Sequence, residues 1–235
     1  MANPQFEYNP PLSPYLTIIY RDDDIVVANK PGGLLSVPGK APIHRDSLIA
    51  RVQRVFPTAT VVHRLDMATS GVMIMALNKA SHRHLSRQFE TRNTHKRYFA
   101  RVDGNVQNNY GEITLPLICD WPNRPKQKVD HEHGKPALTR YEVVRRKDDE
   151  TLVALLPVTG RSHQLRVHML SIGHVILGDR LYADEVIKGK AERLQLHAQS
   201  LIITHPTSGN WLKFEAPIPF GDYSPPPLPL PENNC

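Results

Sequence analysis

One carboxylate in this chain occupies a setting that suits chemistry. Asp66 follows Arg64 by two residues in a polar turn and precedes Gly71 and the apolar run Val72 to Leu77. A strand end that presents a single carboxylate, beside a glycine that lets two backbones approach closely, favours a functional group. Such an aspartate can act as a nucleophile, whereas the structural alternative is a surface ion pair of Arg64 with Asp66 in a plain turn.

Three segments of the chain carry a family resemblance. The stretch His63-Arg64-Leu65-Asp66-Met67-Ala68-Thr69-Ser70-Gly71 resembles the catalytic motif of the RluA family of pseudouridine synthases. The Pro- and Gly-rich stretch 30–39 and the stretch 160–168 resemble other motifs of that family, in the expected order along the chain. A surface ion pair does not explain these additional segments. The resemblance therefore implies that Asp66 is the nucleophile of an RNA-modifying enzyme.

The resemblance also assigns further site residues by motif position. Arg166 matches the family arginine that pairs with the catalytic carboxylate, and Leu165 matches an apolar residue that floors the pocket. Arg161 is a second candidate partner for the carboxylate. Tyr98, which follows a Lys-Arg pair, matches the tyrosine that packs against the target uracil. Without the family, Tyr98 is a core residue and both arginines are surface cations on a helix.

The implied reaction needs only groups that the substrate and a carboxylate supply. Uridine isomerisation breaks the bond from ribose C1′ to uracil N1, turns the base and rejoins it through C5, and an arginine beside Asp66 favours the ionised carboxylate. Attack at C1′, attack at C6 and removal of a ribose proton all remain open for Asp66. Arg64 matches a family arginine that fills the position vacated by the flipped nucleotide, which offsets an unstacking cost of a few kcal/mol. We expect no cofactor.

Charge and aromatic residues indicate RNA as the partner. The formal net charge is +6 and the sequence pI is about 9.4, a balance that favours polyanions. A stiff loop between two strand-like runs carries Trp121 together with Arg124, Lys126 and Lys128, which suits phosphates and unstacked bases. The alternative is a structural Pro-rich turn with Trp121 as its hydrophobic anchor. The segment resembles the family branch that modifies both large-subunit (23S) ribosomal RNA and transfer RNA, which implies stem-loops of both as substrates.

Composition excludes several other classes of protein. The chain has 235 residues, 40% of them hydrophobic, enough for a substantial core, and its apolar runs are too short to cross a bilayer. The stretch 1–15 is unlike a signal peptide, and the cysteines Cys119 and Cys235 are too few for a disulfide framework. We expect a cytoplasmic monomer that binds no membrane. The sequence His131-Glu132-His133 raises the possibility of a metal, but adjacent histidines in a polar loop are usually solvated, so we expect none.

Hydrophobic periodicity predicts an α+β fold with a mixed, largely antiparallel sheet bordered by helices. The expected strands cover residues 16–20, 25–29, 72–77, 95–102, 152–158, 201–204 and 211–215. The expected helices begin after a cap at Asp46 or Ser47, at Ala80, and after a cap at Thr159 or Ser162; in the first, Arg51 lies off the apolar face. We expect an N-terminal extension over 1–15, one catalytic domain over 16–216, and a Pro-rich tail over 217–235 that is loose or packed on the surface rather than a polyproline ligand.

Two other functions are compatible with parts of this pattern. A catalytically silent RNA-binding protein would use the same basic surface. A glycoside or N-glycoside hydrolase would use Asp66 with a second carboxylate. The chemistry of the products separates these alternatives, because an isomerase leaves the mass of the RNA unchanged.

Overall fold

A computed structural model describes residues 8–221 and 223–231. These residues form two compact units, and each is described by itself. The Asp66 unit comprises residues 8–97, 197–221 and 223–231, and the Arg166 unit comprises residues 98–196. Strands β5 and β11 contain the points at which the chain passes from one unit to the other.

The first two strands of the Asp66 unit overlap the strands predicted over residues 16–20 and 25–29. Its elements are β1 (Ile18–Arg21), β2 (Ile25–Lys30), the 3₁₀ turn η1 (Pro42–His44), α1 (Leu48–Gln53), β3 (Thr60–Val61), β4 (Ser70–Ala76), α2 (Lys79–Glu90), β11 (Leu196–Thr204) and β12 (Trp211–Glu215). The strand order is β1-β2-β4-β11, with β12 paired to β11 and β3 paired to β4. The antiparallel hairpin of β1 and β2 confirms the prediction for this region.

Gly71 allows the one parallel pairing in this unit. Strands β4 and β11 run parallel, with His197 opposite Ser70 and Ala198 opposite Gly71. Gly71 has a φ of 119°, and a Cβ atom placed there would collide with the backbone carbonyl of Ala198. The close backbone approach expected at this glycine is therefore present, directly after the Asp66 turn.

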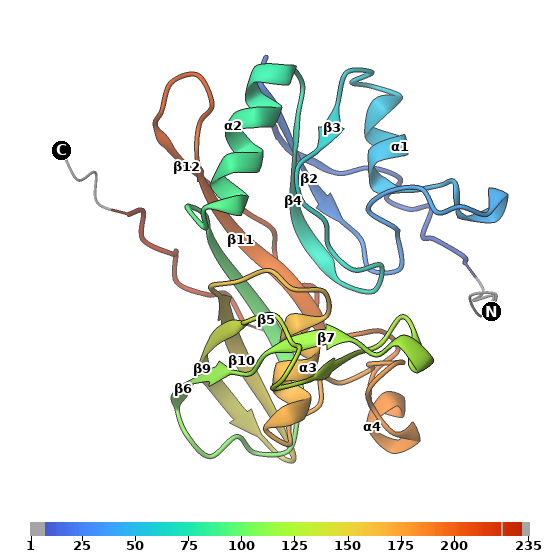
Figure 1. The fold of residues 1–235 in the computed structure, drawn as a ribbon, viewed down its shortest axis with the longest axis vertical. Helices are drawn as coiled ribbons and strands as arrows, with labels where there is room; N and C mark the ends of the chain where they lie inside the picture. The colour runs from blue at the N-terminus through green and yellow to red at the C-terminus, as the bar shows by residue number, and fades with distance from the viewer. Residues whose placement is uncertain (1–7, 222, 232–235) are drawn as a thin grey trace. The chain divides into compact units, whose positions relative to one another are not determined.

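Helix α2 covers the sheet of the Asp66 unit through a buried apolar contact and a polar one. The Asn78 side chain caps its start by accepting the N–H of Ser81 at 2.9 Å, and Leu85 is fully buried. Gln88 exchanges two hydrogen bonds of 2.8 Å with the backbone of Thr204 in β11, so α2 lies beside this strand (Figure 1). The core of this unit consists of Ile25, Val27, Val72, Ile74, Ala76, Leu85, Leu201, Ile203, Phe214 and Ala216.

The Arg166 unit combines an antiparallel meander with a separate two-stranded ribbon. Its elements are β5 (His95–Asp103), β6 (Tyr110–Thr114), β7 (Leu117–Cys119), the 3₁₀ turn η2 (Trp121–Asn123), β8 (Gln127–Val129), β9 (Leu138–Lys147), β10 (Glu150–Pro157), α3 (Gln164–Ser171) and α4 (Glu185–Gly189). The strand order is β5-β10-β9-β6, and every pair in it is antiparallel. Strands β7 and β8 form the ribbon, whose apolar residues Leu117 and Val129 pack with Val167 of α3.

The pairings confirm an α+β fold with a mixed, largely antiparallel sheet, since β4 pairs in parallel with β11 while the other pairings within each unit are antiparallel. Two local expectations are wrong. Arg51 is fully buried rather than lying off the apolar face, because Asp46 accepts two of its N–H groups and the Tyr15 ring lies 4.4 Å from its Cζ. Helix α3 has neither a Thr159 nor a Ser162 cap, because His163 precedes it in a left-handed conformation.

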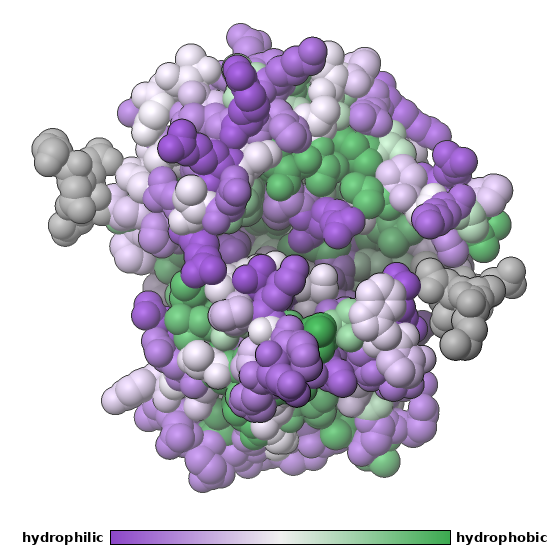
Figure 2. Space-filling model, viewed as in Figure 1, coloured by the Kyte–Doolittle hydropathy of each residue, from purple (hydrophilic) through white to green (hydrophobic). Residues whose placement is uncertain are grey.

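Hydrophilic side chains dominate the face drawn in Figure 2, and hydrophobic ones gather there in smaller areas. The Pro-rich tail lies against the Asp66 unit, because Arg97 donates to the carbonyl of Pro226 at 2.8 Å and Lys213 donates to that of Leu228 at 3.4 Å. This confirms the expectation of a surface-packed extension for that part of the tail. Residues 232–235 lie outside the described part of the chain. No helix in the described residues is long and apolar enough to cross a membrane.

Candidate active site

Asp66 lies in the turn that leads into β4, and its neighbours hold this turn in place. Leu65 is buried, and its backbone forms two hydrogen bonds with the Ser36 hydroxyl, which donates to the carbonyl at 2.6 Å and accepts the N–H at 3.1 Å. The N–H of Thr69 donates to the carbonyl of Asp66 at 3.1 Å and closes the turn. Asp66 itself is half-buried, so packed side chains do not seal its carboxylate from solvent.

A buried ammonium group ties the Pro-Gly loop to the same turn. Lys30 is fully buried at the end of β2, and its Nζ donates to the carbonyls of Pro31, Leu34 and Met67 at 2.7–3.0 Å. Met67 directly follows Asp66, and its carbonyl also accepts the N–H of Gly33 at 2.8 Å. Within the stretch 30–39, neither Lys30 nor Ser36 was predicted from the sequence to have a role. The signal in the sequence that could have revealed the role of Lys30 is a lysine at the end of an apolar strand.

The start of the Asp66 turn is anchored by a neutral histidine. The His63 ring stacks on Phe89 of α2 with centroids 4.4 Å apart, and its Nε2 accepts the N–H of Ile74 at 3.1 Å. Burial, together with the nearby Lys96 ammonium, lowers the pKa of His63 to about 3. The imidazole therefore accepts this hydrogen bond at neutral pH. Arg64, the next residue, is exposed, and the His63 contacts hold the residue before it in place.

Tyr98 begins the part of β5 that belongs to the Arg166 unit. It lies opposite Leu155 of β10 and is half-buried, whereas the following Phe99 and Ala100 are fully buried. Tyr98 therefore lies on a buried strand but is itself partly exposed to solvent. This exposure suits a ring that contacts a ligand better than it suits a core residue.

Arg166 is held in α3 by a carboxylate that the sequence analysis missed. Its Nε and Nη2 donate to the two carboxylate oxygens of Asp179 at 2.7 and 2.6 Å, and both side chains are at most 4% exposed. Asp179 also accepts the N–H groups of Leu181 and Tyr182. A buried guanidinium requires such a partner. The indication in the sequence was a lone aspartate two residues after the apolar run 175–177.

The remaining residues predicted for this helix end are close in the fold. Leu165 is buried beside Arg166 in α3, as expected for an apolar floor. Arg161 is half-buried, and its Nε donates to the carbonyl of Pro136 at 3.2 Å. Thr159 stabilises the helix start indirectly, because its hydroxyl donates to Oε1 of Gln164 at 2.7 Å.

The structure therefore gathers Tyr98, Arg161, Leu165 and Arg166 in the Arg166 unit, while Arg64 and Asp66 belong to the Asp66 unit. Pairing of Asp66 with Arg166 stays a prediction. A guanidinium carries five N–H donors, and Asp179 engages two of those of Arg166.

The ribbon presents the predicted cations at its tip. Trp121 is 66% exposed, so the interpretation of this ring as a hydrophobic anchor is wrong. The guanidinium carbon of Arg124 lies 4.6 Å from the Trp121 ring centroid. Arg124 and Lys128 are exposed and Lys126 is half-buried; the Lys128 ammonium lies 3.8 Å from Asp130. An exposed indole and cations are suited to contact bases and phosphates.

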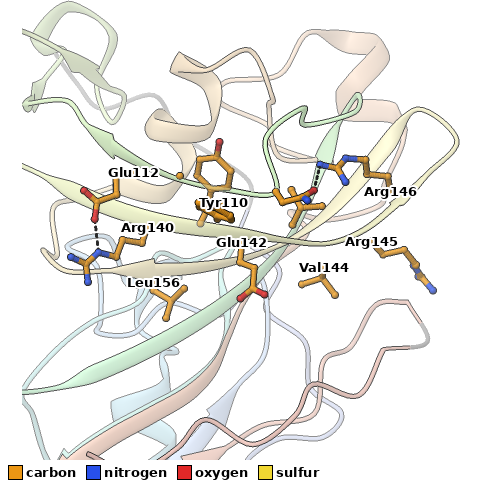
Figure 3. A pocket seen from close by; sticks show the side chains of 12 residues that line it. Tyr110, Glu112, Arg140, Glu142, Val144, Arg145, Arg146 and Leu156 are labelled. Atoms are coloured by element: carbon orange, nitrogen blue, oxygen red, sulfur yellow. Dashed lines mark hydrogen bonds and ion pairs between the residues drawn. The ribbon is translucent and has the colours of Figure 1, made fainter.

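Two other features of the described residues lie apart from these groups. A groove of about 870 Å³ lies on β6 and β9, around Tyr110 and the ion pair of Arg140 with Glu112, and none of the predicted site residues lines it (Figure 3). No cluster of three or more His, Cys, Asp or Glu side chains in the described part of the chain could hold a metal ion.

Comparisons with known proteins agree on one family. The family model described as RNA pseudouridylate synthase matches residues 24–171, a stretch that runs through both units. The chain is 59% identical over 214 residues to the dual-specificity RNA pseudouridine synthase RluA of Escherichia coli strain K12, covering 91% of this chain and 98% of that protein. It is 58% identical over 206 residues to the protein of that name from Yersinia pestis, covering 87% and 100%.

Solved structures give the same family. The human protein named RNA Pseudouridylate Synthase Domain Containing 1 superposes with a TM-score of 0.74 at 30% identity, over 93% of this chain and 87% of that one. The human protein Domain Containing 4 superposes with a TM-score of 0.71 at 26% identity, over 86% and 88%.

Proposed function

The chain belongs to the RNA pseudouridylate synthase family, and on that premise we propose that it isomerises specific uridines in structured RNA to pseudouridine. The observation that carries this proposal is the 59% identity over 98% of the length of an enzyme named dual-specificity RNA pseudouridine synthase. That name, together with the resemblance of residues 115–128 to the branch that modifies two RNA classes, supports 23S ribosomal RNA and the transfer RNA anticodon stem-loop as substrates. The enzyme acts in the cytoplasm as a monomer through a catalytic domain over residues 16–216.

Asp66 is the catalytic carboxylate in this proposal. Its turn is held from both sides by the buried groups of Lys30 and Ser36, so the carboxylate keeps one position without reorganising as the reaction proceeds. It attacks C1′ or C6 of the target nucleotide or removes a ribose proton. Each route leads to cleavage of the bond to N1 and rejoining at C5, with no atom supplied by a cofactor.

Arg166 pairs with the Asp66 carboxylate and Tyr98 packs against the uracil. The bidentate contact with Asp179 fixes the plane of the Arg166 guanidinium and uses two of its five N–H donors. Leu165 forms the apolar floor of the site, and Arg161 adds a second guanidinium to it. The flat ring of Tyr98 limits how the detached base can turn.

Arg64 and the ribbon bind the RNA around the target nucleotide. Arg64 is exposed and long, and its insertion offsets the few kcal/mol that flipping a base from a stack costs. Arg124, Lys126 and Lys128 contact phosphates, and the exposed Trp121 ring stacks on an unpaired base.

Release of tritium from uracil C5 tests the proposal. The purified protein is incubated with transfer and ribosomal RNA labelled at that position, and the modified position is then mapped. We expect tritium release without a change in RNA mass, and its loss in Asp66→Asn, with RNA affinity retained. Asp23→Asn, an exposed carboxylate in the β1–β2 turn, is the matched control and keeps full activity.

Two outcomes would replace the proposal with its alternatives. Binding of RNA by the wild-type protein without tritium release would identify a silent binding protein. Release of free uracil with loss of RNA mass would identify a hydrolase.

A further inference from the structure

Tyr182 connects the ribbon to the helix that carries Arg166. Its ring lies 5.0 Å from Cζ of Arg166. Its hydroxyl accepts the backbone N–H of Gln127, the first residue of β8, at 2.8 Å and lies 2.7 Å from Nδ1 of His163. Because all of these residues belong to the Arg166 unit, the connection is internal to one compact body.

The Tyr182 hydroxyl joins two hydrogen bonds. Its oxygen accepts the N–H of Gln127, and in the His163 tautomer that leaves Nδ1 unprotonated the hydroxyl donates to Nδ1. His163 takes a left-handed conformation with a φ of 53° directly before α3. The chain of hydrogen bonds therefore joins the first residue of β8 to the first turn of the Arg166 helix.

Tyr182 is itself held on two sides. Its backbone N–H donates to Oδ1 of Asp179 at 3.2 Å, the oxygen that also binds Nη2 of Arg166. Its ring packs against the apolar cluster of Leu117 and Val167. One residue thus contacts the carboxylate that orients the guanidinium, the guanidinium itself and the ribbon.

We infer that Tyr182 is a positioning residue that sets the RNA-binding ribbon in register with Arg166. The inference rests on the proposed function. An RNA stem-loop held by Arg124 and Lys128 of the ribbon is thereby placed at a fixed offset from the guanidinium, so one stem-loop can contact both places at once and binds more tightly for it. A substrate too short to reach the ribbon gains nothing from this connection.

The test compares two substrates and separates KM from kcat. Tyr182→Phe removes the hydroxyl and keeps the ring beside Arg166, so we expect KM for an anticodon stem-loop to rise about tenfold while kcat stays within about twofold. With a short single-stranded oligonucleotide that contains the target uridine, both constants should match the wild type. Tyr110→Phe, an exposed tyrosine on β6, is the matched control and should change neither constant with either RNA.

A pair of substitutions at His163 provides the second measurement. His163→Gly suits the left-handed backbone and removes the acceptor, so it should reproduce the rise in KM. His163→Asn also tolerates this backbone and keeps an acceptor near the place of Nδ1, so it should restore the wild-type KM. Thermal unfolding of each variant shows whether the fold is retained.

Equal KM and kcat values in Tyr182→Phe and the wild type would overturn the inference. An equal rise in KM with both RNAs would also overturn it, because a general loss of stability acts on every substrate. A wild-type protein that forms no pseudouridine in either RNA would instead refute the proposed function itself.

Discussion

At the scale of single residues, the most informative group is the Lys30 ammonium. A buried charge costs several kcal/mol unless polar partners replace water, and here three backbone carbonyls do so. One of them, that of Met67, belongs to the Asp66 turn. The same contacts that make this lysine tolerable in the interior therefore hold the turn that carries Asp66, the proposed catalytic carboxylate.

Lys30→Met should lower both stability and turnover. The substitution keeps an unbranched apolar stem but removes the ammonium donor from the carbonyls of Pro31, Leu34 and Met67. The Met67 carbonyl keeps the N–H of Gly33, and each buried carbonyl left unsatisfied costs about 1–3 kcal/mol. We expect a lower midpoint in urea unfolding and, at a temperature where the variant remains folded, a kcat reduced about tenfold or more. Lys40→Met removes an exposed ammonium from the same loop and should leave both quantities unchanged. A folded Lys30→Met protein with wild-type kcat would contradict the proposed role.

Side-chain partners were the part of the site least predictable from sequence. Asp66, Tyr98 and Arg166 were assigned from the resemblance to the family motifs, and their roles stay predictions. Asp179 could not, because the contact that Arg166 makes with a carboxylate 13 residues later depends on how the chain turns after α3. Arg51 illustrates the same limit, since its burial is decided by Asp46 and Tyr15 rather than by helical periodicity.

At the scale of elements, apolar runs predicted seven of the strands and the long helix, but strands β3, β6 and β9 were not predicted. The boundaries of β1, β2, α2 and β5 lie close to the expected ones because alternating or i, i+4 burial is imposed by the core. The start of α3 was predicted wrongly, because a left-handed His163 replaces the side-chain cap. A backbone conformation that the Tyr182 contact favours leaves little trace in local composition.

The parallel pairing of β4 with β11 depends on Gly71. A side chain there would meet the carbonyl of Ala198, and its φ of 119° disfavours any L-residue. We expect Gly71→Ala to destabilise the protein by about 3 kcal/mol or more in urea unfolding, because backbone atoms cannot yield as a flexible side chain would. Gly189→Ala at the end of α4, where a Cβ meets nothing within 4 Å, is the control and should be neutral. A Gly71→Ala protein as stable as the wild type would show that the strands can separate without cost.

Asp24 joins three elements of the Asp66 unit and should make stability depend on pH. Its carboxylate accepts hydrogen bonds from Asn78 and Ser81 at the start of α2 and from Thr207 after β11, and these bonds lower its pKa from 3.8 to about 2. Because the folded pKa is the lower one, this contribution is present above about pH 4 and is lost as the pH falls towards 2.

The stability difference between the wild type and Asp24→Asn measures this contribution. In urea unfolding, the difference should be largest at neutral pH and should shrink between pH 4 and pH 2. Asp23→Asn, at the exposed neighbouring residue, should show no such pH dependence. A difference that stays constant down to pH 2 would mean that the ionised carboxylate is not what stabilises the turn.

At the scale of the whole molecule, the net charge of +6 predicts RNA affinity that falls with salt, because each phosphate contact releases condensed counterions. If Arg124 and Lys128 each contact a phosphate, Arg124→Gln and Lys128→Gln should each reduce the slope of log Kd against log salt by about one. Lys147→Gln removes an exposed cation from the end of β9 and lowers the net charge equally. Equal slopes in all three variants would mean that total charge, and not the ribbon, sets the salt dependence. A slope lowered only in the two ribbon variants places phosphates at the ribbon, where the proposed stem-loop must lie.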